Sequence, residues 1–138
     1  MYRTILASLA LTASLTAATR PFHAFEGDGF DTWKVEGSAF GLAPIAGQTE
    51  GMAHPFTDYA DESLAASVHG GEAAKGTLTS PEFTIADPHI SFLIAGGDLA
   101  GKTAAQLLID GEVVRESVGK RSLRLETARW DVTEFIGR

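Results

Sequence analysis

The sequence has 138 residues and contains no cysteine. This absence excludes disulfide bonds, thiolate metal sites, a cysteine nucleophile and a lipid-modified cysteine behind an export signal. The length is sufficient for one domain with one core. We therefore expect a single domain that is held together by its apolar core and not by covalent cross-links.

Positive charge is also scarce in this chain. Lys and Arg number 11 against 18 Asp and Glu, which gives a net charge of -7 at pH 7. An acidic surface repels nucleic-acid phosphates and anionic lipid headgroups, so neither is an expected partner. The charge balance fits a neutral or cationic ligand but does not identify one.

Long hydrophobic runs are absent outside the N-terminus, where residues 5–18 read ILASLALTASLTAA. This run is rich in Ala, Ser and Thr, and it is shorter than the span of about 20 apolar residues that a membrane helix needs. Arg3 precedes it and small residues end it, a pattern typical of a signal peptide. We expect a signal peptide at 1–18 and a mature region at 19–138. The product would be extracellular, on the cell surface or periplasmic, with no membrane attachment after cleavage.

The mature region lacks a convincing amphipathic helix. It contains short alternating polar and apolar runs separated by turn residues, in a chain with 15 glycines and 5 prolines. Such runs are typical of antiparallel strands. The predicted fold class is all-β: an antiparallel β-sandwich of the jelly-roll or concanavalin-like kind.

Three apolar patterns give specific expectations for the strands. Trp33 and Val35 alternate in FDTWKVEG, which predicts one shared strand face. Trp130 and Val132 alternate in the same way in ARWDVTEF, and we expect both tryptophans in the core. Residues 90–95 form a nearly continuous apolar run, which predicts a strand buried on both faces.

The segment GGDLAGKT, residues 96–103, matches the phosphate-binding pattern G-x-x-x-x-G-K-S/T. That pattern binds phosphate only where a strand leads through the loop into a helix. Here Asp110-Gly111 follows closely, and Asp-Gly between two β-rich segments is a strong signal for a type I′ hairpin. No crossover helix fits in between, so we expect a loop that connects two strands.

Four stretches together resemble one known family. They are FEGDGFDTWKVEGSAFGLAP at 25–44, SVHGGEAAKGTLTSPEFTI at 67–85, ISFLIAGGDLAGKTAAQLLIDGEVVRESVGK at 90–120 and WDVTEFIG at 130–137. In this order they resemble the β-sandwich module attached to many family 32 glycoside hydrolases, known best as a family 66 carbohydrate-binding module. The resemblance implies a non-catalytic, monomeric module of a larger chain. It also implies that further strands would follow Arg138, so the module is expected to be C-terminally incomplete.

The resemblance, with the chemistry of sugar recognition, indicates the candidate ligand-binding residues. Charged and amide side chains pair with sugar hydroxyls, while an aromatic or small-residue surface contacts the C–H face of the ring. The candidates are Arg115, Asp98, Lys102, His69, Glu72, Glu126 and Tyr59. Each has a structural alternative: a surface arginine on a hairpin, a solvated loop or carboxylate, a satisfied histidine, or an aromatic ring packed under its own loop.

No cofactor is expected, with one open alternative. Glu26, Asp28 and Asp31 lie close together in EGDGFD, and carboxylate oxygens are ligands that calcium prefers. Their spacing does not match an EF-hand loop. A structural calcium site is therefore a weak candidate, and the four histidines show no zinc spacing.

Three functional hypotheses remain open at this stage. The first is an exported, non-catalytic carbohydrate-binding module, for terminal fructosyl units of fructans such as levan, that targets an attached enzyme or surface protein to polysaccharide. The second is a structural or protein-interaction β-sandwich of a longer exported protein, without a working sugar site. The third and weakest is a fragment of a fructan-hydrolysing enzyme.

Overall fold

The computed structural model describes residue 25 and residues 27–60, 62–71 and 73–138. The predicted signal peptide lies outside these residues. The described part is built from antiparallel strand pairs, with one short 3-10 turn and no α-helix. The elements are β1 Lys34–Gly37, β2 Gly76–Thr79, β3 His89–Gly96, β4 Ala104–Ile109, β5 Glu112–Val118, β6 Ser122–Asp131 and η1 Thr133–Phe135. The all-β prediction is therefore confirmed.

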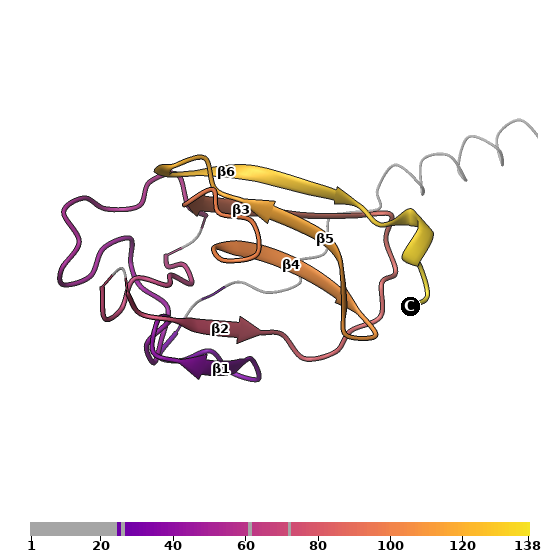
Figure 1. Cartoon of the computed structure of the whole chain (residues 1–138), viewed down its shortest axis with the longest axis horizontal. Coiled ribbons are helices and arrows are strands. Elements are labelled where there is room, and N and C mark those ends of the chain that lie inside the picture. Colours follow the sequence, from indigo (N-terminus) through magenta and orange to yellow (C-terminus); the bar gives the residue numbers. More distant parts are fainter. Residues whose placement is uncertain (1–24, 26, 61, 72) are drawn as a thin grey trace, which may run out of the picture.

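The strands form three two-stranded sheets, β1–β2, β3–β6 and β4–β5 (Figure 1). In Figure 1 the β3–β6 pair is at the top of the view, the β4–β5 hairpin in the middle and the β1–β2 pair at the bottom. Each pair is antiparallel. The finer jelly-roll or concanavalin-like arrangement stays a prediction, because the three pairs are not joined into continuous sheets.

The β4–β5 hairpin has the geometry that its turn residues predict. Ile109 lies opposite Glu112, which leaves Asp110 and Gly111 as a two-residue loop. Both loop residues have positive φ, 52° and 81°. A type I′ turn requires this conformation, which Asp and Gly tolerate better than most residues.

The Gly96–Thr103 loop connects β3 directly to β4, which begins at Ala104. The backbone N–H groups of Lys102 and Thr103 both donate to the Leu99 carbonyl, at 3.0 and 2.9 Å. The loop therefore closes on itself and enters a strand. The expectation of a loop that connects two strands is confirmed.

Two groups of buried apolar side chains form the described core. The first group consists of Ile45, Phe56, Ala66 and Leu125. The second consists of Ile85, Leu107 and Val132, with Ile90, Ile109, Val114, Trp130 and Phe135 packed against it. The second group therefore joins the β4–β5 hairpin to the β3–β6 pair.

The predicted partnership of Trp130 and Val132 is confirmed, since both contribute to the second group. Val132 is fully buried, and the Trp130 ring makes an edge contact with Phe92 at 4.6 Å between centroids. Trp130 Nε1 also donates to Ser117 Oγ at 2.9 Å. Trp130 is thus a core residue whose polar atom is satisfied.

Two of the strand expectations are wrong. β3 is not buried on both faces: Ile90, Phe92 and Ile94 are half-buried, but Leu93 on the other face is 39% exposed. Successive side chains of a strand point to opposite faces, and only one face of β3 is covered. Trp33 and Val35 do not share a strand face either, since β1 begins at Lys34 and Val35 is exposed. Trp33 instead packs edge-on against Phe25.

No helix in the described part of the chain has the length and hydropathy needed to cross a membrane.

Val132→Ala tests the importance of the second core group. The substitution removes two methyl groups from a fully buried position, so we expect the free energy of unfolding to fall by roughly 1–3 kcal/mol. Urea denaturation with an unchanged m-value would measure the loss. Val113→Ala is the matched control, because Val113 is exposed and its truncation should change stability by less than about 0.5 kcal/mol. Equal effects at both positions would contradict the assigned core.

Candidate functional site

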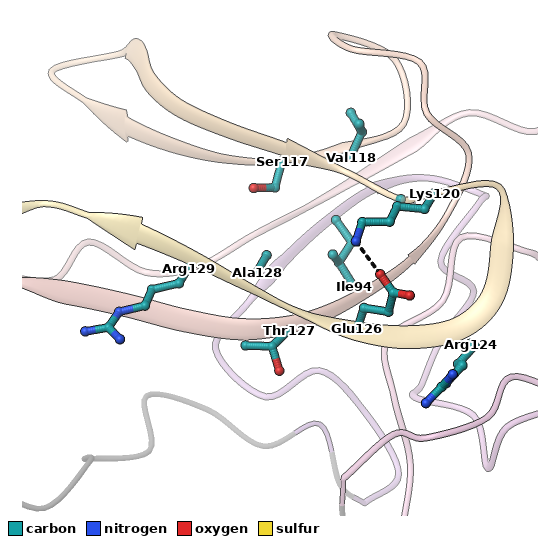
Figure 2. Close-up of a pocket in the computed structure, with 10 residues that line it drawn as sticks. Ile94, Ser117, Val118, Lys120, Arg124, Glu126, Thr127, Ala128 and Arg129 are labelled. Carbon is teal, nitrogen blue, oxygen red and sulfur yellow. Dashed lines mark ion pairs between the residues drawn. The ribbon is translucent and has the colours of Figure 1, made fainter.

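A depression of about 250 Å³ opens between the end of β5, the β5–β6 turn and β6 (Figure 2). It is lined by Ile94, Ser117, Val118, Gly119, Lys120, Arg124, Glu126, Thr127, Ala128 and Arg129. The lining combines small or apolar groups with hydroxyls and charges of both signs. Such a combination can contact a polyol on both its C–H and O–H faces.

An ion pair between Lys120 and Glu126 crosses this depression. Figure 2 shows Lys120 reaching from the β5–β6 turn toward Glu126 on β6, and its Nζ lies 2.6 Å from Glu126 Oε2. A hydrogen bond from Lys120, and the positive charge of Lys120, lower the pKa of Glu126 below its ordinary value. The carboxylate is therefore charged at neutral pH. Its Oε2 is shielded from solvent beside the Lys120 ammonium, which leaves Oε1 as the acceptor for a ligand.

The Gly96–Thr103 loop supports the turn that carries Lys120. Gly119 N–H donates to the Gly97 carbonyl at 3.0 Å, and Arg121 N–H donates to the Gly96 carbonyl at 2.8 Å. The Arg121 side chain also forms an ion pair with Asp98 at 2.8 Å. Asp98 thus acts on the site through Arg121 by fixing the turn.

A second segment from far along the chain borders the same region. Thr57 makes a parallel bridge with Arg124 of β6, and the Asp58 carboxylate accepts a hydrogen bond from Arg124 Nε. Tyr59 follows, half-buried against the first core group, with its hydroxyl end beside Gly47. Tyr59 therefore lies two residues from the contact with β6, but its ring packs against the first core group.

Arg115 lies outside the lining of the depression and is engaged within the chain. Its Nε donates to the Asp131 carbonyl at 3.0 Å and its Nη1 to the Val114 carbonyl at 2.8 Å. Its Nη2 pairs with Glu134, and its guanidinium stacks over the Phe135 ring at 5.0 Å. These contacts fasten β5 to the end of β6 and to η1.

His69 and Lys102 are also separate from the depression. The backbone N–H of His69 donates to the Ala39 carbonyl at 3.0 Å, and its ring packs against Gly41. His69 Nε2 is shielded from solvent and has no hydrogen-bond partner among the described residues. Lys102 is exposed on the Gly96–Thr103 loop.

The weak calcium candidates are only partly described. Glu26 lies outside the described residues, as does the sugar-site candidate Glu72. Asp28 and Asp31 are exposed. Within the described ranges, no three His, Asp or Glu side chains come together in a way that could hold a metal ion.

The structure thus brings two of the predicted site residues to one end of the β3–β6 pair: Glu126 in the depression and Asp98 beside it. Sequence reasoning missed Lys120, Arg121, Arg124 and Ser117. One available signal was the alternation in SLRLET, where Arg124 and Glu126 interleave with the core-facing Leu123 and Leu125. That alternation places Arg124 and Glu126 together on the opposite side of the strand.

Comparison of the chain with protein-family models, with curated proteins and with solved structures found no match.

Arg115→Ala tests whether Arg115 is structural. The substitution removes charge-assisted hydrogen bonds and a cation–π contact from a partly exposed side chain, so stability should fall by roughly 1–3 kcal/mol. Thermal and urea unfolding would measure this loss. Arg129→Ala is the matched control, because Arg129 makes no ion pair with any residue that the structure describes, and it should remain within about 0.5 kcal/mol of the parent. Unchanged stability of Arg115→Ala would contradict the structural role and would make Arg115 a ligand-binding candidate again.

Asp131→Asn tests how the end of β6 responds to acid. Asp131 Oδ1 accepts hydrogen bonds from the Thr133 N–H at 3.0 Å and the Thr133 hydroxyl at 2.7 Å, and these bonds lower the pKa of Asp131 below its ordinary value of 3.8. Because the folded pKa is depressed, the carboxylate's contribution is present above pH 3.8 and is lost as pH falls through the folded value. The parent should therefore be more stable than Asp131→Asn near neutral pH, and the difference should shrink below pH 3.8. A pH-independent difference would contradict this assignment.

Proposed function

We propose that this protein is an exported, non-catalytic carbohydrate-binding module of the β-sandwich kind, and that the depression beside β6 is its ligand site. The proposal assigns it the role of holding an attached enzyme or surface protein on polysaccharide. Following the sequence resemblance, terminal fructosyl units of fructans are the first ligands to test.

The Lys120–Glu126 pair across the depression is the observation that carries this proposal. A sugar hydroxyl both donates and accepts hydrogen bonds. The Lys120 ammonium supplies donors and Glu126 Oε1 supplies an acceptor, while Glu126 Oε2 is shielded from solvent and lies 2.6 Å from Lys120 Nζ. Two neighbouring hydroxyls of one ring can therefore be satisfied together.

The rest of the lining supports the same ligand class. Ile94, Ala128 and Gly119 provide apolar or small surface for the C–H face of a ring. Ser117 and Thr127 add hydroxyl groups. A volume of about 250 Å³ lies below the range of roughly 300–1,000 Å³ typical of ligand pockets, so it suits a single terminal sugar unit better than an internal chain segment.

The proposal changes the residues expected to recognise the sugar. Arg115 is one of the candidates that the resemblance indicates, but it already donates hydrogen bonds to the Asp131 and Val114 carbonyls within the chain. Glu126 is kept, and Lys120 takes the role of the cationic donor. Asp98 becomes a positioning residue, because it holds Arg121 next to Lys120.

A specific observation also favours the second candidate function, a structural or protein-interaction β-sandwich. Lys120, Arg121 and Arg124 are each paired with a carboxylate of the same chain. A ligand must compete with these pairs, whereas a structural module would use them to fix the turn.

Isothermal titration of the mature chain against levan oligosaccharides and a panel of neutral glycans tests the proposal. We expect binding in the millimolar range or tighter. Glu126→Gln and Lys120→Ala should each weaken it by roughly tenfold to a hundredfold, the cost of losing a hydrogen bond to a charged group.

Glu112→Gln provides the matched control, because Glu112 is an exposed carboxylate outside the depression and should leave binding unchanged. Absence of binding by a folded protein would favour the structural module. Binding that survives both site substitutions would move the sugar site elsewhere.

A further inference from the structure

The glycine-rich Gly96–Thr103 loop lies next to the depression without lining it. It meets the β5–β6 turn at Gly119, where the two backbones touch. A Cβ atom at position 119 would meet the Gly96 carbonyl oxygen and would lie only 2.6 Å from Gly96 N and C. A side-chain carbon does not approach a backbone so closely, so glycine is the residue that fits at this contact.

Two hydrogen bonds cross this contact, one on each side of Lys120. Gly119 N–H donates to the Gly97 carbonyl at 3.0 Å, and Arg121 N–H donates to the Gly96 carbonyl at 2.8 Å. Lys120 is the residue between these two donors, so its backbone is held from both sides. Figure 2 shows its side chain extending from the turn toward its carboxylate partner on β6. The position of the Lys120 ammonium therefore depends on how closely the turn rests on the loop.

The other end of the loop is fastened to β5. Glu116 Oε2 accepts hydrogen bonds from the Gly101 N–H at 3.2 Å and from Gln106 Nε2 at 2.6 Å. Glu116 lies on the strand that leads into the turn. The loop is thus joined to β5 at one end and to the turn at the other, so it can hold the turn in a fixed place.

The turn itself has an unfavourable backbone conformation. Arg121 has a φ of 58°, in the left-handed region that residues other than glycine adopt infrequently. Such a conformation persists where the surrounding structure fixes it, and it is found often at ligand sites. Here the hydrogen bond to Gly96 and the ion pair with Asp98 fix it, and both partners belong to the loop.

We propose that Gly119 is a positioning residue: its backbone contact with Gly96 holds Lys120 at the place opposite Glu126 that the ligand site requires. The Gly96–Thr103 loop then acts as the support on which the turn rests. The importance of Gly119 for a ligand rests on the proposed function, whereas the placement of Lys120 can be measured without any ligand.

Gly119→Ala tests this placement, because Gly119 does not have a positive φ and the added methyl group would be directed at Gly96. We expect the turn to move off the loop and Lys120 to move away from Glu126. The pKa of Glu126, measured by NMR titration of its carboxyl carbon, should then rise toward its ordinary value of 4.5, because the hydrogen bond and charge of Lys120 lower it. Lys120→Ala gives the pKa of Glu126 without Lys120, and Gly119→Ala should lie between this value and that of the parent.

Gly29→Ala is the matched control. Gly29 also lacks a positive φ, and a Cβ atom there would be 4.0 Å from the Leu42 carbonyl oxygen, its closest contact. It should leave the pKa of Glu126 unchanged. A substitution that only destabilises the fold would lower the melting temperature without changing this pKa in the folded protein. An unchanged pKa of Glu126 in folded Gly119→Ala, or an equal rise in Gly29→Ala, would overturn the proposal.

A second pair of variants applies if Gly119→Ala does not fold. Glu116→Ala removes the acceptor that fastens the loop to β5, whereas Glu116→Gln keeps an oxygen that can accept from the Gly101 N–H. Both variants remove the same charge, so the difference between them reports the hydrogen bond. The pKa of Glu126 should be higher in Glu116→Ala than in Glu116→Gln. Equal values in these two variants would contradict the supporting role of the loop.

Titration of the same variants with levan oligosaccharides tests the ligand role separately. Where the parent binds, Gly119→Ala should weaken binding by roughly threefold to tenfold, because a less ordered Lys120 loses more side-chain freedom on binding. Parent-like affinity of folded Gly119→Ala would overturn the assignment of Gly119 to the ligand site. If the parent binds no glycan, the proposed function fails, while the pKa of Glu126 still decides whether Gly119 positions Lys120.

Discussion

The antiparallel pairing of β3 with β6 is the constraint on which the rest of this structure depends. β6 contributes Leu125 to one core group and Trp130 to the other, and the chain directly after it contributes Val132. Its register with β3 changes between Ile94 and Gly96, where β6 carries additional residues. A shift of one residue in this pairing would exchange the inward and outward sets of side chains, so both cores depend on one register.

The charged groups organise the surface around this strand more than they stabilise it. The ion pairs Lys120–Glu126, Asp98–Arg121 and Asp58–Arg124 all join side chains that are substantially exposed. Exposed pairs contribute little to stability, typically about 0–1 kcal/mol each. Their effect here is geometric, because they hold the β5–β6 turn and the residue 57–59 segment against β6. Binding of a polyol is favoured by such fixed donors and acceptors, since less side-chain freedom is lost on binding.

Local rules predicted the elements whose conformation is decided by neighbouring residues. Asp110-Gly111 gave the type I′ hairpin, because positive φ is a property of the turn itself. The short distance from Thr103 to that turn was sufficient to reject a nucleotide-binding loop. The prediction for residues 90–95 was wrong because an apolar run does not reveal how many layers cover a strand. β3 has one covered face, which leaves Leu93 exposed.

The site was less predictable than the fold. Glu126 and Asp98 were selected from the sequence, but nothing local indicated that Lys120 would face Glu126 or that Arg121 would meet Asp98. Arg115 was selected for its place in a recognisable stretch, yet Asp131 and Glu134, distant in sequence, decide its hydrogen bonds.

By itself, the sequence determined the all-β class, the hairpin turn, the absence of disulfides and the acidic net charge, because these follow from residue identity or from interactions within a few residues. The tertiary structure alone decided which charges meet, which strands pair and which faces are covered. Those outcomes depend on pairings between segments far apart in the chain, such as Thr57 with Arg124 and Gly96 with Ser122. Side-chain alternation within a single strand predicts two faces but does not predict which segment packs against each face.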